Sequence, residues 1–421
     1  MLVRQYLQWM ATAPEGKRVE AVWPFVKAFF TLDLDDDERE AMEAALTVLL
    51  DDDSREVRRA LAEALAPHAA APRHLVISLI HDHPDVARIV LARSPVVTDG
   101  ELIDAVATGT EGMQLAIARR PRISPALSAA ICEVAARDAV LALLANDGAS
   151  VAAISFRRIA ERFGVEEPVR RALFARKDLP ITVRQSLIRI LTVELGLQAR
   201  RETTMPEKRV EAMVRDACDK ATVALLDGAA EADLHALVEH LRMSGQLTTS
   251  LLIRAICAGH IRFIEASLAS LSGLPAPRVY SILVEGREAS LRALFEKSQL
   301  PERSHPAFIA ALETWRDLDY DGRPGDEYRF SRRMIERILT RYQDFSHSDL
   351  DDLLTMLRRL AADAAREAAR SVAARVVREE SVVHLAAPAP RLRAQQGEAD
   401  DEAGEGDDVD LEVDLRAERA A

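Results

Sequence analysis

The sequence has few aromatic residues and few cysteines, and it has no long apolar run. Aromatic side chains make up 5% of the 421 residues, whereas Ala, Leu and Arg are abundant, a composition that favours closely packed helices over sheets. No stretch alternates apolar and polar residues between hairpin turns, so strands are not expected. No segment approaches the roughly 20 apolar residues of a membrane-spanning helix, and MLVRQYLQWM carries no signal-peptide core, so we expect no membrane association.

Three cysteines, Cys132, Cys218 and Cys257, stand far apart within apolar helical stretches. Their spacing fits neither a disulfide framework nor a zinc site, and buried thiols of this kind are typical of a reducing compartment. We therefore expect a cytoplasmic protein. Walker, G-x-G-x-x-G and G-x-S-x-G motifs are missing, so no residue is predicted to bind a cofactor or to act in catalysis.

The formal net charge of −13 is concentrated near the C-terminus. Residues 394–415 contain ten acidic residues and no Lys or Arg, so they contribute −10 and the rest of the chain −3. Clustered acids and few apolar residues predict a disordered acidic tail over residues 385–421. Within it VDLEVDL alternates acids with apolar residues, which leaves three alternatives: a solubilising tail, a segment that folds on a partner, or one that covers arginines of the same chain.

A helical unit recurs every 26 to 29 residues. Three copies begin at Asp51, His81 and Gly109 and read DDDSREVRRALAEALA, HDHPDVARIVLARSP and GTEGMQLAIARRP. Aligning Val57, Val86 and Met113 gives steps of 29 and 27. A fixed period in this range predicts an α-solenoid, in which each unit buries its apolar face only against its neighbours.

A second array with the same period follows the polar stretch 199–209. Its copies begin at Leu247, Leu274 and Leu300, in steps of 27 and 26, and the period stops beyond Trp315. Two longer helices are expected next, suited to covering the last core face. The sequence therefore predicts four regions: helical arrays over residues 1–200 and 201–315, capping helices over 316–384, and the acidic tail over 385–421.

Helix start signals accompany the repeats. Thr98 and Glu101 have the spacing of a capping box, in which each side chain bonds the backbone amide of the other residue. Thr182 and Gln185 have the same spacing, so we expect a second capping box there.

These units resemble known repeat classes. LARSPVVTDGELIDAV and IARRPRISPALSAAI are similar to leucine-rich-repeat-variant and HEAT-like helical repeats. Together with GHIRFIEASLASLSGLPAPRVYSIL they resemble an uncharacterised bacterial family of unknown function, over residues 40–315. The resemblance implies an all-α fold, a right-handed superhelix of paired helices, and carries over no catalytic residues.

One acidic motif invites a metal assignment. Asp317, Asp319 and Asp321 alternate before Gly322, as in the opening of a calcium-binding EF-hand loop. Position twelve of that loop is Tyr328 instead of the glutamate that calcium needs. We therefore predict no metal site, and an acidic turn is the simpler interpretation.

Arginines form a stripe after this motif. Arg329, Arg333, Arg337 and Arg341 recur every four residues along one predicted helix. The stripe is a candidate site for phosphate or an acidic partner, and the alternative is a solvated face paired with carboxylates. Residues 329–393 hold thirteen arginines against nine acids, and this excess of +4 is small for nucleic-acid binding and argues against it.

The repeats carry arginines of their own, with aspartates in matching turn positions: Arg58, Arg59, Arg88, Arg119 and Arg120, with Asp53 and Asp82. Asp–Arg ladders between successive repeats explain both sets without a ligand.

These patterns predict a non-catalytic protein that holds another protein on its repeat surface, in scaffolding or regulation, without a cofactor. One alternative is a nucleic-acid or anion binder that uses the Arg329–Arg341 stripe. Another is an enzyme built on the solenoid, such as a lyase of the HEAT-repeat type, which a buried polar cluster would favour. The sequence predicts neither the partner nor the oligomeric state.

Overall fold

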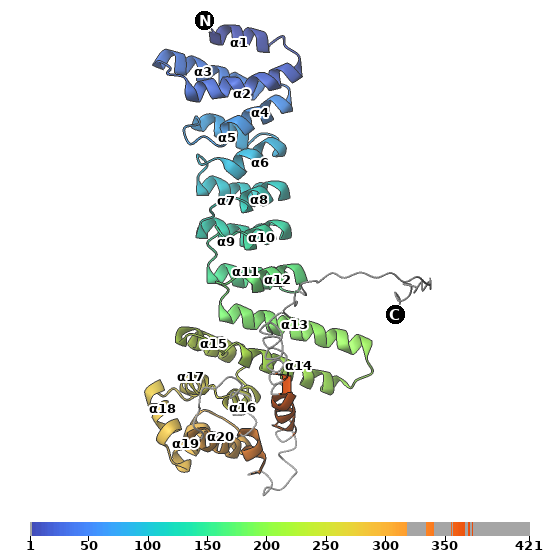
Figure 1. Cartoon of the computed structure of the whole chain (residues 1–421), viewed down its shortest axis with the longest axis vertical. Coiled ribbons are helices and arrows are strands. Elements are labelled where there is room, and N and C mark those ends of the chain that lie inside the picture. Colours follow the sequence, from blue (N-terminus) through green and yellow to red (C-terminus); the bar gives the residue numbers. More distant parts are fainter. Residues whose placement is uncertain are drawn as a thin grey trace, which may run out of the picture. The chain divides into compact units, whose positions relative to one another are not determined.

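A computed structural model describes residues 2–317, 334–340 and 357–366 and the single residues 355, 369, 370 and 373. The chain divides into two compact units, residues 1–368 and 369–421, and the architecture below is that of the first. Every regular element in the described ranges is a helix, as the composition predicts (Figure 1). In the same ranges, no helix combines the length and the apolar character needed to cross a membrane.

Short helices make up the first part of the chain. It begins with α1 (Leu2–Met10), α2 (Glu15–Thr31), α3 (Asp36–Val48), η1 (Leu49–Asp51) and α4 (Arg55–Leu65). Helices of 8 to 11 residues follow: α5 (Arg73–Ile80), α6 (Pro84–Arg93), α7 (Asp99–Thr108), α8 (Glu111–Ala118), α9 (Pro125–Val134), α10 (Arg137–Leu144), α11 (Ala153–Phe163) and α12 (Glu167–Ala175).

Longer helices begin the second part. They are α13 (Ile181–Glu202), α14 (Glu207–Ala224) and α15 (Glu231–Met243), followed by α16 (Thr249–Cys257), α17 (Ile261–Ser272), α18 (Ala276–Glu285), α19 (Glu288–Lys297), η2 (Glu302–Ser304) and α20 (His305–Asp317). Residues 334–340 and 357–366 are also helical.

The short helices stack in two rows (Figure 1). One row contains α2, α4, α6, α8, α10 and α12, each packed on the one before, and the other contains α7, α9, α11 and α13. Helices that are consecutive in sequence, such as α7 and α8 or α9 and α10, pack side by side and join the rows. Within each row, a helix therefore lies against the row's preceding and following helices.

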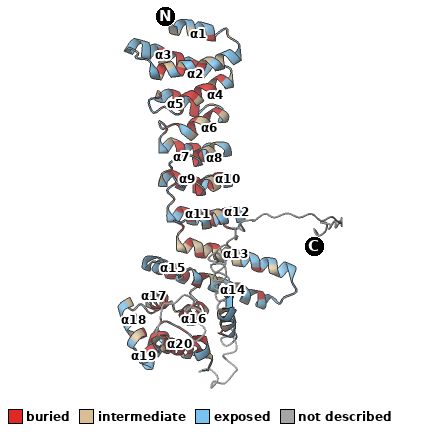
Figure 2. Cartoon of the chain, in the orientation of Figure 1, coloured by how far each residue is buried: buried red, intermediate tan, exposed pale blue. Residues whose placement is uncertain are grey.

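Two apolar clusters form the core of this unit. Buried residues concentrate where the helices meet, and exposed residues cover the outer faces (Figure 2). The first cluster runs from Met10 to Leu187 and the second from Val223 to Leu360. The predicted boundary at residue 200 falls between them, and the division into four regions stays a prediction.

The two predicted capping boxes have different outcomes. At α7 the box is formed: the Thr98 amide donates to Glu101 Oε2 at 2.8 Å, and the Glu101 amide donates to Thr98 Oγ1 at 3.5 Å. At α13 the prediction is wrong, because the helix follows Pro180 without a side-chain cap and Gln185 is fully buried. The Gln185 side chain is directed to partners in the interior instead of to the helix terminus.

Candidate functional site

Arginines bond backbone carbonyls at or just after the ends of helices that come earlier in the chain. Arg120 donates from Nη1 to the Leu91 carbonyl at 2.6 Å and from Nη2 to the Ser94 carbonyl at 2.8 Å. Two more make the same kind of pair: Arg162 with the carbonyls of Cys132 (2.6 Å) and Ala135 (2.8 Å), and Arg176 with those of Asn146 (3.0 Å) and Ala149 (3.2 Å). Donor and acceptors are 26 to 30 residues apart, which is one repeat. Because the last carbonyls of a helix have no partner within it, Arg120 and Arg162 supply missing donors at the ends of α6 and α9. Arg176 instead bonds carbonyls of the turn that follows α10.

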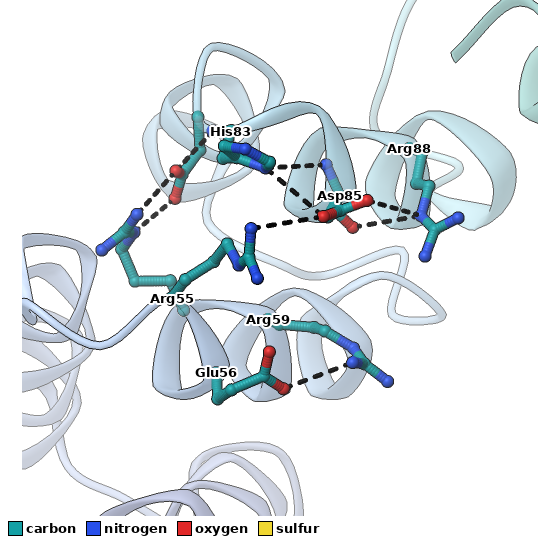
Figure 3. A network of polar contacts seen from close by, with 8 residues as sticks. Arg55, Glu56, Arg59, His83, Asp85 and Arg88 are labelled. Carbon is teal, nitrogen blue, oxygen red and sulfur yellow. Dashed lines mark hydrogen bonds and ion pairs between the residues drawn. The ribbon is translucent and has the colours of Figure 1, made fainter. Parts of the chain in front are cut away.

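An Asp–Arg network joins α4 to the start of α6. Arg58 Nε lies 2.7 Å from Asp82 Oδ2. Arg55 Nη1 lies 3.5 Å from Asp85 Oδ2 (Figure 3). Partial burial by itself raises the pKa of Asp82, but the hydrogen bonds from Arg58 and from a backbone amide outweigh it, so the pKa is lowered. The predicted ladder is therefore present at this junction, whereas Arg88 contacts Asp85 of its own helix. The arginines of this network are engaged by the protein itself, so a ligand is not needed to explain them.

An apolar groove lies between α1, α2 and α3. We call it the α1–α3 groove; its volume is about 860 Å³, within the range of pockets that hold ligands. Its walls include Val3 and Tyr6 of α1, Phe25 and Ala28 of α2, Met42 of α3, and the turn residues Leu32 and Leu34. Three helices thus contribute to one apolar surface.

An aromatic pair forms part of this wall. The rings of Tyr6 and Phe25 stack with their centroids 4.0 Å apart, and the Tyr6 hydroxyl donates to the Ala21 carbonyl at 3.4 Å. Burial, and then the charge of Asp52, raises the pKa of Tyr6 to about 12. The phenol therefore stays neutral, and the wall keeps its apolar character.

The rim of the α1–α3 groove is acidic. Four carboxylates stand among its lining residues, and these include no Lys or Arg: Asp33, Asp35, Asp37 and Glu38. Asp35 caps α3, since its Oδ1 accepts the Glu38 amide at 2.8 Å, and the start of α3 therefore fixes where the rim lies. An apolar trough with an acidic rim is complementary to a helix that has one apolar face flanked by Lys or Arg.

Most of the candidate residues from the sequence lie outside the described residues: Asp319, Asp321, Arg329, Arg333 and Arg341. The two that are described contact each other, because Arg337 Nη1 lies 3.3 Å from Asp317 Oδ2. Both side chains are more than half exposed, and an exposed pair of this kind contributes about 0–1 kcal/mol to stability. Over the described ranges, no group of three or more His, Cys, Asp or Glu is arranged to hold a metal ion.

The sequence patterns did not identify the α1–α3 groove. Its walls come from three helices whose residues show no repeat and no known motif. The available signal was the alternation Leu32-Asp33-Leu34-Asp35 after an aromatic helix, which places apolar side chains and carboxylates next to each other.

Comparison with known proteins gives one family. The model of a family described as an uncharacterised protein conserved in bacteria (DUF2336) matches residues 86–348. No curated protein and no solved structure matches the chain. The matched range begins in α6 and ends beyond α20, so the α1–α3 groove precedes it.

Proposed function

We propose that this chain, which belongs to the DUF2336 family of bacterial proteins, is a non-catalytic adaptor that holds another protein in a groove next to the first helix of its helical-repeat array. The observation that carries the proposal is the α1–α3 groove, which combines an apolar trough with an acidic rim. Its partner is an amphipathic helix whose apolar residues fill the trough and whose Lys or Arg residues face the rim.

The proposal includes the repeat architecture. Helices that pack on neighbours one repeat away, and arginines that bond carbonyls one repeat away, support a right-handed α-solenoid of short HEAT-like units. Such an array is a rigid support for a binding surface at one of its ends. The groove lies next to α4, the first helix of the predicted repeats, because α2 packs directly on α4.

The proposal also places the protein in the cytoplasm. The three cysteines are free, and two of them, Cys132 and Cys257, are buried. Burial raises the pKa of both thiols to about 12, so they remain protonated and unreactive. Unreactive free thiols support a reducing compartment.

A contact between a serine and a histidine is relevant to the alternative that the protein is an enzyme. Ser186 Oγ lies 3.2 Å from His240 Nε2 and donates to the Thr182 carbonyl at 3.0 Å. Gln185 donates its amide to Gln246 at 2.7 Å, which leaves its Oε1 as the acceptor 3.1 Å from His240 Nε2. Nε2 therefore carries the proton, and it cannot take a proton from Ser186. The contact holds α13 against α15 and does not activate a nucleophile.

The adaptor function is tested by affinity capture with matched baits. Leu32 in the groove and Val48 outside it are 56% and 54% exposed, so Leu32→Asp and Val48→Asp alter similar surfaces at different places. We expect a protein retained by the wild type and by Val48→Asp to be lost with Leu32→Asp. Removing one buried leucine from an interface weakens affinity roughly 10- to 100-fold, because it costs about 1.5–3 kcal/mol.

The control for charge uses α3. Asp37 lies on the rim and Glu40 does not, and both are exposed. Asp37→Lys should weaken capture in low salt, and Glu40→Lys should leave it unchanged. Equal retention by the two aspartate variants of Leu32 and Val48, or a wild-type bait that retains no protein, would refute the proposed function.

A further inference from the structure

A second cavity lies within the region that matches the family. It has a volume of about 800 Å³ and is formed by α13, α14, the turn before α16, the start of α16, and η2 with the residue before it. Thr355 and Arg359 also contribute to its wall. We call it the α13–α16 cavity. Unlike the α1–α3 groove, it is lined by arginines, hydroxyl groups and amides.

Positive charge reaches this cavity from four segments. Arg189 belongs to α13, Arg215 to α14, Arg303 to η2, and Arg359 to the helix at 357–366, and all four side chains are exposed. Within the described ranges, Arg189, Arg215 and Arg359 form no ion pair. Arginines with opposite-charge partners are common among the helices α4 to α12 and the residue that follows α12, residues 55–176, which we call the α4–α12 stack. Arg189, Arg215 and Arg359 differ from those arginines.

The negative charge in the cavity is smaller and partly neutralised. Two aspartates line it, Asp216 and Asp219. Asp216 forms an ion pair with Arg254, which is 5% exposed and lies behind it. Burial raises the pKa of Asp219, whose Oδ2 accepts a hydrogen bond from Ser250 Oγ at 2.8 Å. The three arginines without an ion pair in the described ranges, Arg189, Arg215 and Arg359, therefore outweigh the two carboxylates.

The N-terminus of α16 adds to this positive potential. Thr248 caps the helix, since its Oγ1 accepts the Leu251 amide at 3.2 Å, and Thr248, Thr249 and Ser250 all line the cavity. The first amides of a helix carry partial positive charge and favour anions. Guanidinium groups and a helix N-terminus thus meet in one cavity of ligand size.

We propose that the α13–α16 cavity binds a small phosphate-bearing molecule, with Arg189, Arg215 and Arg359 around its phosphate. Arginine is suited to this group because its planar fork donates two parallel hydrogen bonds to phosphate oxygens. Gln246 and Thr192 also line the cavity and supply donors and acceptors for the rest of the molecule. The site lies apart from the α1–α3 groove and does not depend on the adaptor function.

The test is calorimetric titration of the full chain with inorganic pyrophosphate at constant ionic strength. We expect saturable binding that Arg189→Gln and Arg215→Gln each weaken about 10-fold, since each removes a charge-assisted hydrogen bond. Arg209→Gln is the matched control, because Arg209 is an exposed residue of α14 outside the cavity. It should bind pyrophosphate as the wild type does.

A variant that removes a negative charge from the cavity provides a second test, because it should bind the ligand more tightly. Asp219→Asn removes a negative charge from the cavity and keeps an acceptor for Ser250, so it should bind pyrophosphate several-fold more tightly than the wild type. The proposal is overturned if millimolar pyrophosphate gives no saturable binding. It is also overturned if Arg189→Gln and Arg209→Gln bind alike, or if Asp219→Asn weakens binding.

Discussion

The α4–α12 stack and the α13–α20 region use arginine in different ways. In the stack, Arg120 and Arg162 bond the carbonyls at the end of a helix that lies 26 to 30 residues earlier in the chain. In the later region, Arg189 and Arg215 line a cavity instead. Arg316 is an instructive exception there, because it bonds the carbonyls of Leu283 (2.9 Å) and Gly286 (3.1 Å) as a stack arginine would. In this protein, these arginines thus bond a neighbouring helix where the end of that helix is within their reach.

Helix length accounts for this difference. The helices α5 to α12 have 8 to 11 residues, so the end of each lies close to side chains of the next repeat. In contrast, α13 has 22 residues, which corresponds to about 33 Å at 1.5 Å per residue. Arg189 lies in the middle of this helix, away from either of its ends. Its side chain lines the cavity instead of bonding the end of a helix.

The largest expected effect is the difference in the free energy of unfolding between Arg162→Gln and Arg189→Gln. Arg162→Gln removes both donors from the Cys132 and Ala135 carbonyls and should lower the free energy of unfolding by about 2–4 kcal/mol. Arg189→Gln should change it by less than about 0.5 kcal/mol, as is usual for an exposed side chain without an ion pair. Urea unfolding followed by circular dichroism measures both. If both variants lost the same free energy of unfolding, arginines that bond a helix end would not differ in this respect from arginines that line the cavity.

A smaller effect is expected where α13 packs on α14. Gly196 is buried there, and a Cβ at this position would lie 2.3 Å from Val214 Cγ2. Gly196→Ala should therefore destabilise the packing of α13 on α14 by about 1–3 kcal/mol. Hydrogen exchange should locate the loss in α13 and α14 and leave the α4–α12 stack unchanged.

The control for Gly196 comes from the stack. Gly100 of α7 has open space where its Cβ would be, so Gly100→Ala should stabilise the protein by about 0.4–1 kcal/mol. If Gly196→Ala also stabilised the protein, the close approach of α13 to α14 would not restrict the side chain at position 196.

The smallest expected effect is a difference in pH dependence. Burial, and then the charges of Arg157 and Arg189, lowers the pKa of His240. The unfolded chain therefore binds more protons below about pH 6.5, and stability falls as pH drops from there through the folded pKa. The free energy of unfolding, measured from pH 7.5 to 5.5, should decline less steeply in His240→Gln than in the wild type.

The stability of the α4–α12 stack depends on pH in another range. The pKa of Asp82 is lowered in the folded state, so its contribution is present above about pH 3.9 and is lost as pH falls through the folded pKa. Hydrogen exchange at pH 5.5 should then show protection lost around His240 and kept at the junction of α4 and α6. Parallel loss in both places would contradict this separation.

Some features of this protein follow from the sequence by itself. The helical character of the described ranges and the capping box at Thr98 could be predicted, because each depends on residues within one or two helical turns. The prediction that Asp–Arg contacts join the repeats was confirmed for Arg58 and Asp82. Their spacing of 24 residues is close to the period, so neighbouring repeats bring them together.

Other features were decided only by the tertiary structure. The pattern Thr182–Gln185 predicted a cap, but Gln185 bonds Gln246, 61 residues away, because the interior there offers an amide partner. The α13–α16 cavity likewise brings Arg189 next to residues from η2 and from the helix at 357–366. A helix start is encoded by neighbours along the chain. A cavity forms where distant segments fail to fill the space between them, and the packing of whole helices determines which side chains line it.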